Sequence, residues 1–485
     1  MLASHKRFIQ APQYVYMGCT MSSASVYRGL GHQVLAMHRF LGQYKDTLTT
    51  RASRKSWPRR KDTWRVADAY FRGLLRPGRR KNMHGISARM DLDEDQVERF
   101  IRESPWDHET LQGHLSASIP MALRSQKAVL VIDDFGLGKQ GKHSVGVQRQ
   151  YSGTLGKVGN CQVAVDLIYV TPGKERNADQ RTWPLGTEIY LPKEWAEDAA
   201  RRREAGVPGS VRFRTKPEIA LGMIDRALEH GVEHRAILGD AGYGDDGELR
   251  GGLRRRKEPY VLGVTPSEIR VIDASVPLVP PGPSERGRAR RHHTYPKGTP
   301  VRSASEIADG VKKWTTIKWS EGTKGTLSGK FHRVRVRVTK GSVNLRRATD
   351  EVAWLLLERR EDELKAYLCW GLDGASMKEL VGLAHVRWAI EQFHKEAKQL
   401  LGLDDFEGRT WRAWHHHVSM VLLAYAFVSM LRAQRCDGPL PSLRATVIAI
   451  VQEVLTQMMM REHGLKRLDA YALATDIRRG FTDWF

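Results

Sequence analysis

The sequence predicts an α/β fold in which helices flank a mixed sheet, and three observations carry this prediction. The apolar runs 129–132 and 236–239 have the length and composition of buried strands, and each is followed directly by an aspartate. A helical repeat of apolar residues surrounds Glu391. Strict alternation over residues 333–338 is typical of a strand with one exposed face.

The first 120 residues show helical patterns and no strand pattern. Residues 1 to about 25 have weak periodicity, and Asp62 is expected to cap a helix that runs through Leu75. Shorter helical stretches follow up to residue 103. A basic turn lies among them. This turn consists of Arg79, Arg80 and Lys81. Either the helical region uses it to bind a DNA groove, or it is an ordinary solvated turn.

Strand patterns dominate from residue 121 onward. We expect strands within 144–170, then an amphipathic helix from Lys216 to His230, and a further strand at 259–264. A stretch rich in Pro, Gly and Arg, 277–300, is expected to be a loop or a domain junction. Residues 301–370 are again β-like. Their alternating segment is expected to bury three valines and to expose a face that suits a DNA backbone, formed by Arg333, Arg335 and Arg337.

Glu391 lies on a predicted helix among cations. A period of 3.6 residues places Arg387, Lys395 and Lys398 on the same face as Glu391. The opposite stripe, which faces the core, consists of Ile390, Phe393, Ala397 and Leu401. Taken alone, this pattern also fits an ordinary helix with ion pairs at a spacing of four residues.

Three carboxylates in this arrangement suit a divalent metal site. The ends of neighbouring strands converge, so Asp133 and Asp240 are expected to lie together, with Glu391 as a third oxygen ligand. Mg²⁺ prefers oxygen ligands, and two such ions clamp the attacking and leaving oxygens of a phosphoryl transfer. The cations around Glu391 are then expected to contact phosphates of a nucleic-acid backbone.

Composition agrees with a polyanionic partner. The chain has 78 Lys and Arg against 55 Asp and Glu, a formal charge of +23. Its four cysteines show no metal-ligand or disulfide spacing, which suits a reducing cytoplasm, and we expect them to be buried and inert. The longest apolar helix, 418–431, is expected to be too short to span a membrane, and no export signal is apparent.

The motifs resemble those of DDE transposases of bacterial insertion sequences, of the type whose glutamate helix carries a Tyr, Arg, Glu, Lys signature. The segments that carry the resemblance are VLVIDDFGLGKQGKHSVGVQRQYSG, AILGDAGYG and RWAIEQFHKEAKQLLGLDDFEGRTW. Their order and spacing also match, and the similarity extends from about Lys61 to Arg435.

The resemblance implies an RNase H-like catalytic domain that holds two Mg²⁺, with Mn²⁺ as a substitute, through Asp133, Asp240 and Glu391. Arg387 and Lys398 would contact DNA phosphates. Two positions depart from the family pattern. Phe135 stands where the family has a small hydroxyl residue, although the spacing still favours Asp133 over Asp134 as first ligand. Ala384 replaces the signature tyrosine, so that an aromatic DNA contact is either lost or supplied by His385 or Trp388.

The resemblance also divides the chain. It implies an N-terminal helical DNA-binding region (1–120), a catalytic domain in two parts (121–264 and 373–435), a β-rich insertion domain (265–372) and a C-terminal helical region (436–485). In relatives an aromatic residue of the insertion stacks on a flipped base. Trp314 and Trp319 are candidates, but we favour a structural role for both because tryptophan is usually buried.

The resulting expectation is a cytoplasmic, nucleoid-associated enzyme that cleaves the terminal inverted repeats of an insertion sequence and joins them to target DNA, as a homodimer when the two ends are paired. Two alternatives remain open. One is a regulator that binds DNA without catalysis, and the other is an RNase H-like nuclease without strand transfer. The run His415, His416 and His417 is not expected to form a metal site, because successive helical positions point in different directions. We expect it at the surface or on DNA.

Overall fold

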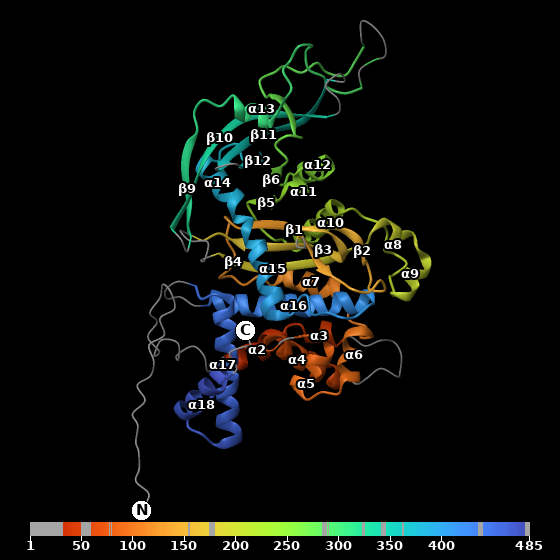
Figure 1. Ribbon diagram of the computed structural model, residues 1–485, viewed down its shortest axis with the longest axis vertical. Coiled ribbons are helices and arrows are strands. Elements are labelled where there is room, and N and C mark those ends of the chain that lie inside the picture. The colour runs from red at the N-terminus through yellow and green to blue at the C-terminus, as the bar shows by residue number, and fades with distance from the viewer. Residues whose placement is uncertain are drawn as a thin grey trace, which may run out of the picture.

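A computed structural model describes residues 33–49, 60–76, 78, 80–153, 156–173, 180–283, 289, 291–322, 325–340, 346–360, 363–434 and 440–480. The molecule is elongated (Figure 1). A layer of N-terminal helices and a helical pair near the C-terminus lie at one end, the central sheet lies in the middle, and a long β extension lies at the other end. The expected weakly structured start, 1–25, falls outside the described residues.

The middle of the molecule is the RNase H-like sheet, which confirms the predicted α/β class. Its strands run in the order β4, β3, β1, β5, β6, and β2 pairs with the first part of β3. The pairs β1–β3 and β3–β4 are antiparallel, whereas β1–β5 and β5–β6 are parallel. The strands are β1 (Val129–Gly138), β2 (Gln148–Ser152), β3 (Lys157–Thr171), β4 (Arg181–Tyr190), β5 (Ala236–Gly239) and β6 (Tyr260–Val264).

Strand β1 does not end at its aspartates. The sequence suggested a strand closing at Ile132, but hydrogen bonding to β3 continues without a register shift through Asp133 and Asp134 to Gly138. The reason is that β3 is fifteen residues long and offers backbone partners along this whole length. Asp133 therefore lies in the middle of an antiparallel pair rather than at a free strand end.

The β-rich segment continues the same sheet. Strand β12 pairs with β6, so all twelve strands among the described residues belong to one sheet. This segment contributes β7 (Arg270–Asp273), β8 (Arg302–Ser303), α13 (Ala304–Asp309), β9 (Thr315–Gly322), β10 (Gly325–Lys340), β11 (Arg347–Arg360) and β12 (Glu363–Trp370).

Helices cover both faces of the central sheet. Helix α15 packs on β1, and α10 packs on β3 from the opposite face. Helix α10 begins with a capping box at Thr215 and Glu218, which agrees with the predicted helix. The helices of this part are α8 (Lys193–Glu197), α9 (Ala199–Glu204), α10 (Lys216–Glu229), α11 (Ala241–Gly244), α12 (Gly247–Arg255), α14 (Met377–Val386) and α15 (Trp388–Leu401).

Helix α16 (Trp411–Ala433) lies between the sheet and the N-terminal helices α4 and α6, as Figure 1 shows. It packs against β4 and against α4, α6 and α7, and α7 itself also packs on β4. The N-terminal helices are α2 (Gln33–Gly42), α3 (Lys45–Leu48), α4 (Arg60–Leu75), α5 (Met83–Met90), α6 (Glu94–Arg102) and α7 (His108–Ala117). Because α4 begins at Arg60, the expected cap at Asp62 is wrong.

The position of α16 corrects two expectations. The helix is longer than the expected 418–431. Among the described residues, two helices are long and apolar enough to cross a membrane by length and composition, α16 and α17 (Leu443–His463). Helix α17 pairs with α18 (Arg467–Gly480). The apolar window of α16 is 89% buried within the protein, the position of a core helix.

The histidine run at 415–417 is also buried, not at the surface as expected. His416 contacts the carbonyl oxygens of Ile101 and Trp106, each at 2.9 Å. Burial lowers the pKa of His416 to about 3 and that of His417 to about 4. As a neutral ring with one N–H, His416 donates to one of these two carbonyl oxygens, and the buried histidines tie α16 to its neighbours as core groups.

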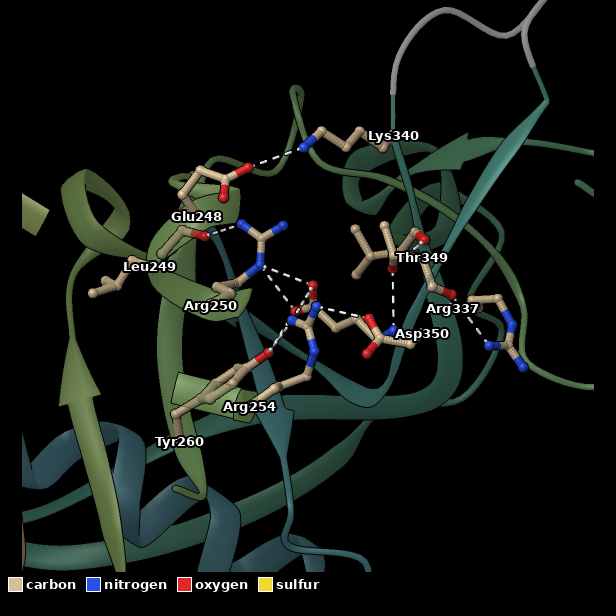
Figure 2. Close-up of polar contacts among 12 residues, drawn as sticks. Glu248, Leu249, Arg250, Arg254, Tyr260, Arg337, Lys340, Thr349 and Asp350 are labelled. Carbon is tan, nitrogen blue, oxygen red and sulfur yellow. Dashed lines mark hydrogen bonds and ion pairs between the residues drawn. The ribbon is translucent and has the colours of Figure 1, made fainter. Parts of the chain in front are cut away.

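A buried ionic cluster joins the central sheet to its β extension. Figure 2 shows Arg250 and Arg254 of α12 reaching, together with Tyr260 of β6, toward β11. There the carboxylate of Glu351 accepts from Arg250 Nε at 2.9 Å and from the Tyr260 hydroxyl at 2.6 Å, and it lies 2.9 Å from Arg254 Nη1. Because Glu351 is 1% exposed, this cluster fixes the two parts of the sheet relative to each other.

Candidate active site

Two aspartates meet where β1 and β5 run in parallel. The register pairs Val129 with Ala236 and Val131 with Leu238. Continued by two residues, the same register brings Asp133 level with Asp240, which follows the last residue of β5 and begins α11. Parallel pairing therefore produces the convergence that the sequence predicted for these two carboxylates.

The surroundings of this pair favour a bound cation. Burial, with added repulsion from Asp240, raises the pKa of Asp133 to about 7. Burial also raises the pKa of Asp240, and Asp134 adds to this effect. The Oδ1 atom of Asp240 is buried and has no hydrogen-bond partner. Two desolvated carboxylates with an unsatisfied oxygen form a donor set that fits a hard divalent ion such as Mg²⁺.

Glu391 does not converge with the two aspartates in this structure. Arg387 lies between them, with Nη1 3.1 Å from Asp133 Oδ2 and Nη2 2.6 Å from Glu391 Oε1. Among the residues that the structure describes, no group of three acidic, histidine or cysteine side chains is close enough to hold one ion. The expected three-carboxylate cluster is thus present as two carboxylates, with the third joined to them through a guanidinium.

The two neighbouring aspartates of β1 face opposite sides of the sheet. Asp133 points to the face covered by α15, where it meets Arg387. Asp134 points to the other face, where Lys216 Nζ of α10 lies 2.9 Å from its Oδ2. Because successive side chains of a strand point to opposite faces, Asp133 and Asp134 cannot both face α15, and only Asp133 shares a face with the helix that carries Glu391.

A buried Asp–His pair lies beside Asp133 and was missed from the sequence. Asp166 of β3 is the direct partner of Asp133 in the sheet and is 1% exposed. Its Oδ2 lies 2.8 Å from Nε2 of His394, and its Oδ1 accepts from the Thr187 hydroxyl. His394 is on α15, three residues after Glu391. The available signal was a single carboxylate within the apolar run 163–170.

The cations of α15 divide into two kinds. Lys395 is exposed. Lys398 is half-buried, with Nζ 5.3 Å from the ring centroid of Phe135 and 3.4 Å from the carbonyl oxygen of Gly136. The predicted apolar stripe of this helix is confirmed, because Ile390, Phe393, Ala397 and Leu401 are buried.

The aromatic position near Arg387 has one exposed candidate. His385 is packed against the β extension, because its ring stacks on Trp319 at 3.9 Å between centroids with an interplanar angle of 5°. Trp388 is 45% exposed at the start of α15. Ala384 is buried. Trp314 and Trp319 pack against the hydrophobic core, which agrees with the structural role favoured for both.

The arginines of β10 are less exposed than expected, and their role as a DNA contact stays a prediction. Arg333 lies 4.3 Å from the ring centroid of Trp354 and donates to the carbonyl of Ala375. Arg335 forms an ion pair with Asp373 at 2.5 Å, and Arg337 donates to the carbonyl of Thr349. All three are half-buried, and the guanidinium groups of Arg333 and Arg335 lie over the ring of Trp354 on the neighbouring strand.

The basic turn at 79–81 is also different from the expectation. Lys81 is 4% exposed, and its Nζ donates to the carbonyl oxygens of Leu74 and Leu400. Burial lowers the pKa of Lys81 to about 7. It therefore anchors the N-terminal helices to the end of α15 and does not face DNA. Arg80 is exposed, and Arg79 falls outside the described residues.

Comparison with known proteins places this site in a family. A family model described as DDE superfamily endonuclease matches residues 47–326, more than half of the chain, so the chain belongs to this family. The match includes Asp133 and Asp240 and ends before Glu391.

A similar protein supports this assignment. The probable transposase for insertion sequence element IS701 of Microchaete diplosiphon is 34% identical over 177 residues, which is 36% of this chain. The aligned segment spans 42% of that relative, less than half of its length. The resemblance to DDE transposases of insertion sequences is thereby confirmed.

Proposed function

We propose that the protein is a transposase that binds the ends of an insertion sequence, cleaves the DNA there and joins the freed ends to target DNA. The observation that carries this proposal is the pair Asp133 and Asp240, two desolvated carboxylates on adjacent parallel strands with an unsatisfied oxygen. Membership of the endonuclease family and the transposase relative support it.

Asp133, Asp240 and Glu391 would hold two divalent ions, Mg²⁺ or Mn²⁺. When bound, these ions would stabilise the transferred phosphate as Lewis acids and activate the attacking oxygen. The chain's own part is to position the donors. Arg387 now offsets the charges of Asp133 and Glu391. A DNA phosphate offers the same guanidinium a competing bidentate partner, and the transfer of Arg387 to it would free both carboxylates for metal.

The remaining cations and the exposed tryptophan extend this surface toward DNA. Lys395 and Lys398 lie on the same helix as Glu391 and would contact the backbone near the reacting phosphate. Trp388 takes the place of the missing signature tyrosine, because His385 is already stacked on Trp319. A homodimer would be needed to hold two ends at once.

The test is cleavage of supercoiled plasmid that carries the DNA flanking the gene, with and without Mg²⁺. Wild type is expected to nick only with metal, and Glu391→Gln and Asp240→Asn are expected to be inactive. Asp134→Asn is the matched control, because it removes a carboxylate one residue from Asp133 on the other face of β1. Loss of cleavage in Asp134→Asn with retention in Asp133→Asn would reverse the assignment of the first ligand.

The products separate the alternatives. Joined products that carry the flanking sequence in a new target are expected from a transposase, whereas nicked DNA alone would favour a nuclease without strand transfer. Binding of the ends with no cleavage by wild type in either metal would favour a regulator. Equal cleavage by wild type and Glu391→Gln would refute the role of the glutamate.

A further inference from the structure

A second surface with the character of a DNA contact lies beyond the carboxylates, on the ribbon formed by β2 and residues 157–160 of β3. Between Asp134 and Asp166 the sequence contains no acidic residue. At the chain's overall frequency of 55 acidic residues in 485, these 31 positions would hold about three or four. The same stretch carries four cations, Lys139, Lys142, Arg149 and Lys157.

The sheet register places part of this ribbon on the active-site face. Asp133 pairs directly with Asp166, and every second residue of β3 from Asp166 down to Val158 shares that face. Arg149 pairs with Asn160, and Tyr151 pairs with Val158, without a register shift. Directly paired residues share a face. The side chains of Arg149 and Tyr151 therefore lie on the same side of the sheet as Asp133.

On the ribbon, two large, mainly apolar side chains, Tyr151 and Val158, are exposed next to the cation Arg149. Tyr151 is 62% exposed and Val158 is 51% exposed, Arg149 is exposed on the same face, and Lys157 is exposed on the opposite face. An exposed Tyr and Val suit contact with sugars and base edges, and the cations suit phosphates. Asp404 and Glu407 lie near Lys139, and Glu194 accepts from Gln148 at 3.1 Å, so Arg149 is the cation of this face that suits a phosphate. Because the ribbon has no acidic residue of its own, its complementary partner is double-stranded DNA, and a two-stranded ribbon fits the major groove.

The ribbon is connected to the active site by both β1 and α15. Strand β1 runs from Asp133 to Gly138, which pairs with Cys161, the partner of Gln148 in β2. Five residues at roughly 3.3 Å span about 17 Å, or about five base pairs at 3.4 Å each. Helix α15 follows the same direction, since Arg387 contacts Asp133 and Lys398 contacts Gly136. A duplex seated at Asp133 could thus continue over the ribbon.

We propose that this ribbon binds double-stranded DNA through Arg149 and Tyr151, about five to six base pairs from the phosphodiester placed at Asp133. Arg149 contacts a phosphate, and Tyr151 contacts the sugar or a base edge. This proposal rests on the proposed function and adds to it a second DNA contact that fixes the position of the duplex relative to the carboxylates.

The test measures the affinity of the full chain for a short mixed-sequence DNA duplex by fluorescence anisotropy over a series of NaCl concentrations. Loss of one phosphate contact lowers the slope of log K against log salt by about 0.9, which is about fivefold in Kd at about 0.15 M salt. Arg149→Ala is expected to show both effects. Tyr151→Ala is expected to raise Kd with an unchanged slope, because it removes no charge.

The matched control is Arg255→Ala, which removes one exposed cation at the other end of the parallel strands, next to the start of β6. It is expected to keep the slope of wild type. If wild type binds and cleaves DNA while Arg149→Ala and Tyr151→Ala match it in Kd and slope, the ribbon contact is refuted and the proposed function stands. If wild type itself does not bind the duplex, both fail.

Discussion

Removal of the Glu351 carboxylate is expected to produce a large loss of stability. Glu351→Ala leaves two guanidinium groups and a hydroxyl in a buried site without their shared acceptor. Removing one partner of a buried ion pair costs about 3–5 kcal/mol. Arg254 keeps Asp350 at 2.9 Å and Arg250 keeps the carbonyl of Gly244, so we expect about 3–4 kcal/mol.

The assay is urea unfolding followed by far-UV circular dichroism, with hydrogen exchange of the amides in β6 and β11 as a local readout. Glu351→Gln keeps the size and one acceptor and is expected to lose about 2 kcal/mol. Glu248→Ala is the control. It breaks the neighbouring pair with Lys340 that Figure 2 also shows, but both side chains are largely exposed, so no measurable change is expected.

A result within about 1 kcal/mol of wild type for Glu351→Ala would refute this reasoning, since the lower bound for an uncompensated buried charge lies near 3 kcal/mol. Equal losses in Glu351→Ala and Glu248→Ala would refute it as well, because burial is the difference between the two pairs.

Three further predictions concern the buried ionisable groups. The raised pKa of Asp133 means that the folded protein holds a proton more tightly than the unfolded chain, so stability without metal should fall as pH rises from about 4 to about 7. Asp133→Asn should flatten this dependence in urea unfolding at pH 5 and 7.5, and an unchanged slope would contradict the assignment. The pKa of Lys81 is lowered, so the unfolded chain binds its proton more tightly, and stability should rise with pH between about 7 and 10. Lys81→Met should remove that rise relative to wild type. His394→Ala leaves one oxygen of the buried Asp166 without its partner, so we expect a loss of about 1–3 kcal/mol in thermal or urea unfolding, together with slower DNA cleavage. Wild-type stability in His394→Ala would show that the Asp166–His394 pair does not stabilise the fold.

Local patterns were sufficient for the elements that build the site. The apolar runs before Asp133 and Asp240 predicted β1 and β5 correctly, because a strand buried on both faces needs apolar residues regardless of which strands it pairs with. The apolar stripe of α15 gave its orientation, because a helix buries one face. The alternation over 333–338 gave the strand β10 but not the environment of its arginines, because the partner Trp354 comes from another strand.

The sequence by itself determined the α/β class, the elements that carry Asp133, Asp240 and Glu391, and the family, since these depend on residue type and spacing along the chain. Only the tertiary structure decided which groups meet. It separated Asp133 from Asp134 by strand alternation, placed Arg387 between Asp133 and Glu391, and buried Lys81. The physical reason is that burial and electrostatic pairing are set by neighbours far away in sequence, which pairing registers and helix packing bring together.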